Sequence, residues 1–371
     1  MAKKLILIGP KTGIKGGANV SFNYLLDELN RRNVSYTCID MPGGNYSFKR
    51  FFMIAAYLMR FAKTIKKDSV ISLHASNNSA VVYTIILDVI ARVTQSKLII
   101  RVFGGQHLNF LEKQRGFLKT RVLQCYKRHT LLLETKNIVK QSKSDFGLAS
   151  VKWFPNSRPD VPPKKFGSFE DDQPLKVLFI SQVRWNKGID RVISLAEYII
   201  KNSLNARISV YGSVFDKNFL SEINSLPDSV IKYNGVAKPE DVYDIMRDSD
   251  LLYFPTRYPG EGYPGVIIEA INVMLPVISS DTQNIRDLIE HNKDGLLVDF
   301  NEEEKVFAEI AELTRNRSKL KEMHINLEQK RNQFSSEYWN GEFFLSLVGR
   351  NKKGKPQRPP KESEQGKAPA E

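Results

Sequence analysis

Glu261-Gly-Tyr-Pro-Gly-Val-Ile-Ile-Glu269 is the stretch that decides the fold of this 371-residue chain. An apolar run, Leu251 to Pro255, precedes it and predicts a buried strand, and Pro264 is suited to the first turn of the helix that follows. Glu261 is therefore expected in a loop and Glu269 on the helix. Helical side chains lean toward the N-terminus, which brings Glu269 back toward the helix start, roughly 10 Å from Glu261 at about 1.5 Å of rise per residue.

The start of this helix is expected to bind an anion. The first amide groups of a helix have no internal partner and carry partial positive charge, which favours a phosphate at Gly265, Val266 and Ile267. Carboxylates accept hydrogen bonds from sugar hydroxyls. The stretch suits a ligand with a diphosphate in its middle and hydroxyl groups at both ends. The alternative explanation is that Glu261 is a solvated loop residue and Glu269 is an ordinary acid of an early helix turn.

The length of the chain exceeds what one hydrophobic core usually organises, so two domains are expected. Cys38 and Cys125 have neither metal-binding spacing nor a disulfide framework, which favours a reducing cytosol. The apolar run Leu5–Ile8 is too short for a signal peptide, and Val81–Ala91 is interrupted by Asp88. The sequence therefore predicts a cytoplasmic protein without a membrane span.

Charge is distributed unevenly along the chain. Residues 1–160 hold 26 Lys or Arg against 9 Asp or Glu, whereas residues 161–349 hold 22 against 29. The basic first half predicts an anionic partner: nucleic acid, phospholipid or a phosphorylated acceptor. Nucleic acid is disfavoured, because the chain has no recognised binding module and few aromatic residues stand among the basic ones as stacking platforms.

Two basic segments of the first half favour contact with an anionic membrane surface. Residues 47–67 combine Phe, Met, Ile and Leu with Lys and Arg, as do helices that lie in a membrane interface. Between residues 113 and 128, basic residues are interleaved with Phe117, Leu118, Val122 and Leu123. A helix with its apolar side on the core and a solvated basic side is the alternative. The first interpretation predicts a peripheral location on the inner face of the cell membrane.

The N-terminal residues predict the beginning of a doubly wound α/β domain. A strand at Lys4–Ile8 precedes a glycine-rich loop at 9–17, and a helix follows to about Arg32. Gly16 and Gly17 allow the backbone to approach a ligand closely, or they form a simple tight turn.

Two further strands of the first half end in polar or glycine residues. Residues 70–74 end at His74, and residues 97–103 precede Gly104, Gly105 and His107. Ligands in such sheets collect beyond the carboxyl ends of the strands, which places His107 near the expected crevice. A structural histidine is the alternative.

Three motifs of the second half resemble those of a known enzyme family. They are Glu261-x7-Glu269, Leu275-Pro-Val-Ile-Ser-Ser280 and Asp294-Gly-Leu-Leu-Val298. Together they resemble the retaining, nucleotide-sugar-dependent glycosyltransferases of family four, also called glycosyl transferases group 1, which have the GT-B fold. The resemblance is specific across residues 175–330 and weaker before them.

The resemblance implies two doubly wound, parallel-sheet (Rossmann-like) domains that face a crevice. Residues 1–160 are expected to bind the acceptor and residues 161–349 the nucleotide sugar, with the last helices returning to the first domain. The composition of residues 157–174 is that of an interdomain linker. The composition of residues 350–371 predicts a disordered basic tail.

The resemblance also implies roles for particular residues. Glu261 meets hydroxyls of the donor sugar, Glu269 the ribose and Lys187 the diphosphate, and His107 is a further catalytic candidate. The family's arginine position is occupied by Gln182, and Arg184 is the alternative cation. The expected donor-binding set is Gly16, Gly17, Gln182, Arg184, Lys187, Gly235, Val236, Glu261, Gly262, Tyr263, Pro264, Gly265, Val266 and Glu269.

The implied reaction is the transfer of a sugar from a nucleotide diphosphate sugar, UDP favoured over GDP, with retained anomeric configuration (EC 2.4, hexosyltransferase type). The acceptor is expected to be a lipid-linked glycan in capsule, lipopolysaccharide or exopolysaccharide assembly, and a soluble acceptor is the alternative. No cofactor or metal is expected, because Asp248-Ser-Asp250 is interpreted as a helix end and strand start. The alternative is a catalytically inactive relative that binds a sugar nucleotide or a membrane. Two departures from the family pattern favour it: Gln182 replaces an arginine, and Met274 replaces a glycine.

Overall fold

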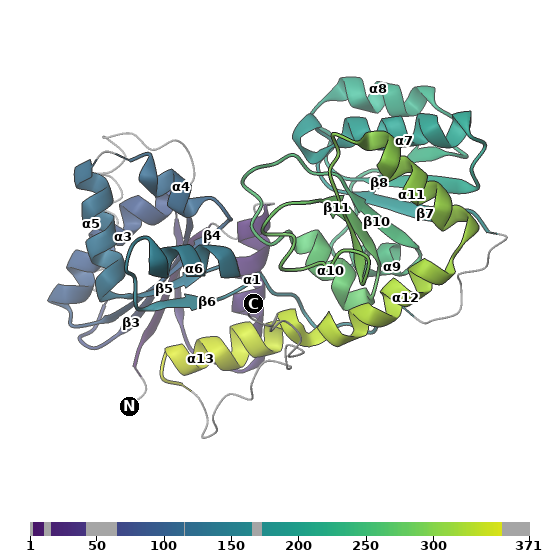
Figure 1. The fold of residues 1–371 in the computed structure, drawn as a ribbon. Helices are drawn as coiled ribbons and strands as arrows, with labels where there is room; N and C mark the ends of the chain where they lie inside the picture. Colours follow the sequence, from purple (N-terminus) through teal and green to yellow (C-terminus); the bar gives the residue numbers. More distant parts are fainter. Residues whose placement is uncertain (1–2, 11–15, 42–64, 115, 165–172, 351–371) are drawn as a thin grey trace, which may run out of the picture.

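Two parallel six-stranded sheets form the cores of two domains that lie side by side (Figure 1). The computed structural model describes residues 3–10, 16–41, 65–114, 116–164 and 173–350. Parts of four predicted features lie outside these residues: the glycine-rich loop at 11–15, the basic segment up to residue 64, the linker at 165–172 and the tail from residue 351. The predicted α/β architecture of two doubly wound domains is confirmed.

The first sheet has the strand order β2-β1-β3-β4-β5-β6, and all neighbouring strands are parallel. Its four inner strands, β1, β3, β4 and β5, are nearly continuous buried runs, as is usual where helices cover both faces. The strands are β1 (Leu5–Pro10), β2 (Thr37–Met41), β3 (Val70–Ser76), β4 (Lys97–Phe103), β5 (Thr130–Leu133) and β6 (Val151–Trp153). The helices are α1 (Gly17–Arg31), α3 (Asn77–Val93), α4 (His107–Glu112), α5 (Gly116–Arg128) and α6 (Lys136–Ser144).

The second sheet has the order β12-β11-β10-β7-β8-β9 and is also parallel throughout. The order reverses between β7 and β10, where a crevice is expected beyond the strand ends. The strands are β7 (Leu175–Ile180), β8 (Ala206–Tyr211), β9 (Ile231–Tyr233), β10 (Leu251–Phe254), β11 (Val277–Ser280) and β12 (Gly295–Val298). The helices between them are η1 (Trp185–Lys187), α7 (Ile189–Lys201), α8 (Lys217–Ser225), α9 (Val242–Arg247) and α10 (Gly265–Val273).

The last helices run from the second domain back to the first, coloured yellow in Figure 1. Trp339 and Phe344 are buried in the same apolar cluster as Phe22 of α1. The chain thus crosses between the domains twice, and the crossings are paired: Arg158 N donates to Phe334 O at 3.0 Å and Ser336 N to Arg158 O at 2.8 Å. The segment comprises α11 (Glu303–Arg315), α12 (Ser318–Leu327), η2 (Glu328–Phe334), η3 (Glu337–Phe343) and α13 (Phe344–Leu347).

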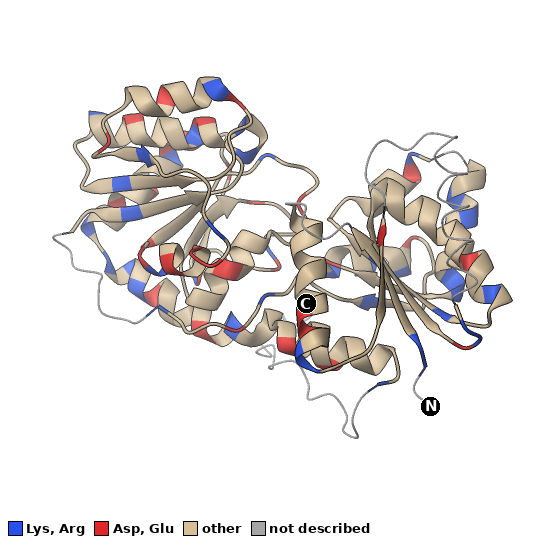
Figure 2. Cartoon of the chain, turned by 180° about the vertical axis from the view of Figure 1, so that it is seen from behind, with Lys and Arg blue, Asp and Glu red and all other residues tan. Residues whose placement is uncertain are grey.

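Helix α5 turns most of its apolar side to the core of the first domain. Val122 is fully buried, and Leu118 and Leu123 pack against the core cluster. The prediction of a membrane-facing apolar side is therefore wrong for these three residues, whereas Phe117 is 85% exposed. Figure 2 shows Lys and Arg in blue along the outer helices of this domain.

Part of this basic charge is neutralised within the fold. Asp88 of α3 is fully buried and forms ion pairs with Arg92, Arg121 and Arg128. The acid that interrupts the apolar run of α3 thus anchors α5. No helix in the described part of the chain is long and apolar enough to cross a membrane.

Candidate active site

A cavity of about 800 Å³ lies between the two domains, at the carboxyl ends of strands from both sheets. The first domain contributes the start of α1 and the residues after β3, β4 and β5. The second contributes the loop after β7 and the stretch 258–265. The polar lining side chains are Ser21, Ser76, Asn77, Gln106, Glu134, Asn156, Ser181, Gln182, Arg184, Asn186, Lys187, Tyr258, Glu261 and Tyr263.

Two of the predicted catalytic residues contact each other in this cavity. Lys187 Nζ forms an ion pair with Glu261 Oε1, and both side chains are mostly buried, at 16% and 14% exposed. Thr256 Oγ1 lies 3.4 Å from the same carboxylate oxygen, and the Lys187 ammonium lies 4.7 Å from the centre of the Tyr258 ring. The pair therefore joins the loop after β7 to the loop after β10.

Gly188 makes this contact possible. It has a φ of +80°, and a Cβ atom at this position would lie 2.1 Å from the carbonyl oxygen of Pro255. Only glycine combines this backbone conformation with such a close approach. The Lys187-Gly188 dipeptide thus holds the lysine beside the end of β10.

The start of α10 carries a cation that the sequence did not predict there. Pro264 and Gly265 line the cavity, and a Cβ atom on Gly265 would lie 1.6 Å from Nη2 of Arg158. Arg158 belongs to the connection between the domains, and its Nε donates to Glu269 Oε1 at 2.6 Å. The Glu269 carboxylate, expected to bind a ribose, is therefore held by an arginine and is not among the lining residues.

Glu134, directly after β5, connects the two domains. Its carboxylate accepts hydrogen bonds from Gly104 N at 2.9 Å and, across the interface, from Tyr263 N at 2.7 Å. Burial raises the pKa of this carboxyl, against the lowering effects of the two N–H donors and of Arg101. The sequence analysis missed Glu134, although it stands at the end of a parallel strand, where ligands of such sheets collect.

Tyr263 is a second connection between the domains. Its hydroxyl donates to Asp287 Oδ2 at 2.7 Å and accepts from Lys136 N at 3.2 Å, and its carbonyl oxygen accepts from Asn156 Nδ2 at 3.1 Å. The ring is buried. The predicted donor-binding tyrosine therefore also fixes the position of the second domain against α6 and β6.

Arg101 lies beneath the cavity in β4. It is fully buried between the rings of Phe103 and Phe154, and Nη2 donates to Ser21 Oγ at 2.9 Å. Burial lowers the pKa of its guanidinium to about 9, and the nearby Glu134 carboxylate opposes this shift. Positive charge is thus placed under the floor of the first domain's half of the cavity.

His107 does not lie in the cavity, so the structure gives no support for its predicted catalytic role. It begins α4 with its ring fully buried, and Nε2 lies 2.8 Å from the hydroxyl of Tyr126. Burial lowers the pKa of His107 to about 4. The ring turns into the core because α4 starts at this residue, so strand-end position alone was a misleading signal.

The predicted donor-binding residues divide into two groups. Those that line the cavity are Gly17, Gln182, Arg184, Lys187, Glu261, Gly262, Tyr263, Pro264 and Gly265. Those that lie outside its lining are Gly16, Gly235, Val236, Val266 and Glu269. Arg184 Nη1 donates to Gln182 Oε1 at 3.3 Å, so the alternative cation lies next to the glutamine that occupies the family's arginine position.

The Asp248-Ser-Asp250 motif has a structural position, as expected from the sequence. Asp248 caps α9 and pairs with Lys176, while Asp250 pairs with the buried Lys164 and accepts from Lys176 N at 3.0 Å. Both carboxylates therefore fix the start of β10.

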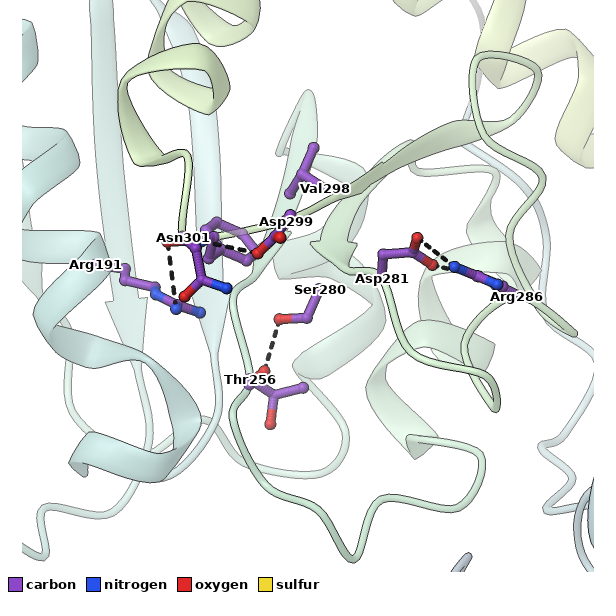
Figure 3. A pocket seen from close by; sticks show the side chains of 9 residues that line it. Arg191, Thr256, Ser280, Asp281, Arg286, Val298, Asp299 and Asn301 are labelled. Carbon is purple, nitrogen blue, oxygen red and sulfur yellow. Dashed lines mark hydrogen bonds and ion pairs between the residues drawn. The ribbon is translucent and has the colours of Figure 1, made fainter.

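A separate cavity of about 370 Å³ lies in the second domain beyond β11 and β12 (Figure 3). Its polar groups bond largely to one another: Arg286 pairs with Asp281, and Ser280 Oγ donates to Thr256 O at 2.6 Å. Thr256 lies between this cavity and Glu261, so the smaller cavity backs the wall of the larger one.

Comparisons with known proteins agree with this geometry. Residues 160–330 match the family described as glycosyl transferases group 1. The chain is 27% identical to the amylovoran biosynthesis glycosyltransferase AmsK of Erwinia amylovora over 150 residues, which are 38% of this chain and 37% of AmsK. It is 26% identical to the capsular polysaccharide biosynthesis glycosyltransferase CapM of Staphylococcus aureus over 165 residues, 43% of this chain and 42% of CapM. The matches thus span about two fifths of these curated relatives.

The fold has a close counterpart over nearly its whole length. The crystal structure of Anabaena HepE in complex with UDP covers 93% of this chain and 100% of its own, with a TM-score of 0.70 and 14% sequence identity. At this identity the likeness establishes the fold, with its two facing domains and the crevice between them. Residues 160–330 thus match the model of glycosyl transferases group 1, the family that the sequence motifs resemble, and the chain as a whole has the GT-B fold.

Proposed function

We propose that this protein is a retaining glycosyltransferase that transfers a sugar from a nucleotide diphosphate sugar, with UDP as the favoured nucleotide, to a glycan acceptor. The observation that carries the proposal is the Lys187–Glu261 ion pair, which faces the interdomain cavity beside the start of α10. It brings a cation for a diphosphate and a carboxylate for sugar hydroxyls to one place.

The proposed mechanism uses these two groups in turn. When a donor binds, Lys187 turns from Glu261 to the diphosphate and stabilises the charge that grows on the leaving group. Glu261 then accepts a hydrogen bond from a hydroxyl of the donor sugar. The start of α10 at Gly265 favours the same anion.

No protein nucleophile is needed in this scheme. A phosphate oxygen of the donor takes the proton of the acceptor hydroxyl as the glycosidic bond to the diphosphate breaks and the new bond forms on the same face. The two domains orient donor and acceptor and exclude water from the cavity.

The comparisons support the choice of nucleotide and pathway class. HepE was crystallised with UDP, and AmsK and CapM are named for the biosynthesis of amylovoran and of a capsular polysaccharide. We therefore propose an acceptor in cell-surface polysaccharide assembly. A lipid-linked acceptor at the inner face of the membrane suits the basic first domain, with its exposed Phe117.

Thermal unfolding with a panel of UDP-, GDP- and ADP-sugars tests the donor, because a ligand of the native state raises the unfolding midpoint. We expect a shift with UDP or a UDP-sugar that Lys187→Ala reduces. Incubation of the same UDP-sugar with lipid extracts should then yield a glycosylated product with retained anomeric configuration. A shift without a product in any extract would favour the catalytically inactive alternative, and the absence of any shift would contradict the proposed donor site.

A further inference from the structure

A second, smaller interdomain cavity adjoins the proposed donor cavity. It has a volume of about 280 Å³ and shares Gln106, Tyr258 and Glu261 with the larger one. Its first-domain wall comes from α4 and α6, and its second-domain wall from the loops 258–261 and 282–284. A ligand in it would therefore reach the carboxylate to which we assign the donor sugar.

The lining of this cavity is dominated by carboxamides. Six side-chain amides line it: Gln106, Asn109, Asn137, Gln141, Gln283 and Asn284. Each offers one acceptor oxygen and two N–H donors in a fixed plane. Glu261 is the only charged side chain among the described residues that line it. We refer to these six residues as the amide pocket.

The amide pocket has hydrogen-bonding capacity that the protein does not use. The side-chain oxygens of Asn284 and Thr282 are buried in its wall without a hydrogen-bond partner among the described residues. Gln141, on α6, also lines the pocket and is partly buried. Buried polar groups are nearly always hydrogen-bonded, and leaving one unpaired is costly. A polar ligand is a direct way to satisfy them.

The chemistry of the pocket selects the kind of ligand. A phosphate or carboxylate would lose its hydration here without meeting a cation, which is strongly unfavourable. Hydroxyl groups both donate and accept, and amides match them in both roles. The volume lies at the lower end of ligand pockets, which run from about 300 to 1,000 Å³, and suits a single sugar ring.

The geometry points to the amide pocket as a subsite for a neutral sugar unit of the acceptor. This inference rests on the proposed function, since it takes the adjoining cavity as the donor site. It assigns the recognised end of the acceptor to an uncharged, hydroxyl-rich sugar and places any lipid phosphate outside the pocket. A site built to hydrogen-bond hydroxyls discriminates strongly against ligands that lack them.

The subsite also depends on the relative position of the domains. Gln283 Nε2, from the second domain, donates to Asn137 Oδ1, from the first, at 2.8 Å. Asn284 Nδ2 donates to the carbonyl oxygen of Glu261 at 2.8 Å. The amide pocket is thus complete only while the domains are in contact. One of its amides, Asn284, also holds the backbone at Glu261.

The test uses the full chain, saturated with UDP, on an array of neutral and acidic glycans, followed by affinity measurements with the bound glycans. We expect binding to neutral glycans and no preference for acidic ones. Gln141→Leu, and Gln141→Glu, which keeps the volume but removes both N–H donors, should each weaken the binding by roughly two- to tenfold. Gln124→Leu, an exposed amide on α5, is the matched control and should leave it unchanged.

The inference would be overturned by the absence of binding to any neutral glycan while UDP still stabilises the protein, or by tighter binding to phosphorylated or carboxylated glycans. Neutral-glycan binding that Gln141→Leu and Gln141→Glu both leave intact would also overturn it. If the unmodified protein does not bind UDP, the result contradicts the proposed donor site and not the subsite.

Discussion

Arg158, in the connection between the two domains, donates a hydrogen bond from Nε to Oε1 of Glu269 on α10 at 2.6 Å. The arginine side chain is 4% exposed and the glutamate side chain 17%. Nη1 of the arginine donates to Asn156 Oδ1 and to the carbonyl oxygen of Ser157. Among the described residues only one oxygen of Glu269 accepts a side-chain hydrogen bond, so we propose that the other accepts a ribose hydroxyl while the ion pair stays intact.

Arg158→Met should destabilise the protein and weaken the binding of the nucleotide donor. Removing one member of a buried ion pair leaves a charge without a partner, which costs about 3 kcal/mol of unfolding free energy. Denaturant unfolding measures this loss, and titration with UDP measures the loss of affinity. The double variant Arg158→Met with Glu269→Gln should recover part of the stability but not the affinity. Equal affinity in parent and Arg158→Met would contradict the assignment of Glu269 to the ribose.

Lys187→Ala and Glu261→Ala should each lower turnover by about 100-fold or more, because each removes a preorganised contact of the transition state. Their effects should not multiply in the double variant, since the two groups pair with each other. Initial rates with the identified UDP-sugar, measured for the parent, both single variants and the double variant, complete this double-mutant cycle. Lys176→Ala, which removes a cation that pairs with Asp248 outside the cavity, is the control. Near-normal rates for either single variant would show that the site is assigned wrongly.

Glu134 should make the stability fall as the pH rises from the usual range of a glutamate. Burial raises the pKa of this carboxyl in the folded state, so the folded state binds the proton more tightly than the unfolded state does. The contribution is fully present below the unfolded pKa and is lost as the pH rises through the folded one. Glu134→Gln cannot titrate. The unfolding free energy of Glu134→Gln minus that of the parent should therefore increase as the pH rises above about 4.5. A difference that does not change with pH would contradict the raised pKa of Glu134.

His107→Phe should lower stability with little effect on turnover. The substitution removes the contact with the hydroxyl of Tyr126, which is worth about 1 kcal/mol, and leaves the cavity lining unchanged. Thermal unfolding and initial rates of the same preparation separate the two effects. A large loss of turnover at temperatures where the variant is fully folded would restore a catalytic role for this histidine.

Phe117 should contribute to membrane binding. It is 85% exposed on α5, and Lys119 follows on the same helix. We expect the protein to co-sediment with vesicles rich in anionic lipid at low salt, less so at high salt, and Phe117→Ala to lower the bound fraction. Ile200→Ala, an exposed apolar residue of the second domain, should not change it. Failure of the parent protein to co-sediment at low salt would rule out the membrane partner.

The sequence was sufficient for the fold because the information is local. Parallel strands covered on both faces must be continuous apolar runs, as Leu5–Ile8 and Leu251–Phe254 are, and such runs are visible without knowing their neighbours. The position of Lys187 followed from a motif of adjacent residues. Its contact with Glu261 did not, since the two are 74 positions apart and meet only through the pairing of β7 with β10.

The residues that the sequence did not reveal act across the domain interface. Glu134 pairs with Tyr263 across the interface and Arg158 pairs with Glu269 on α10, and in each pair the two residues are more than 100 positions apart in the chain. No local pattern marks such pairs. The basic segment around α5 shows the opposite error. Leu118, Val122 and Leu123 pack on the core of the first domain, and Arg121 and Arg128 of α5 pair with Asp88 of α3.

The return of the last helices to the first domain has a consequence for the order in which the protein is made. The cluster around Phe22 is completed by Trp339, Phe344 and Leu345, which leave the ribosome only after the whole second domain. The second domain, by contrast, has its strands together in one continuous stretch of the chain. During synthesis the first domain therefore keeps an open apolar surface until Trp339, Phe344 and Leu345 have emerged and can cover it.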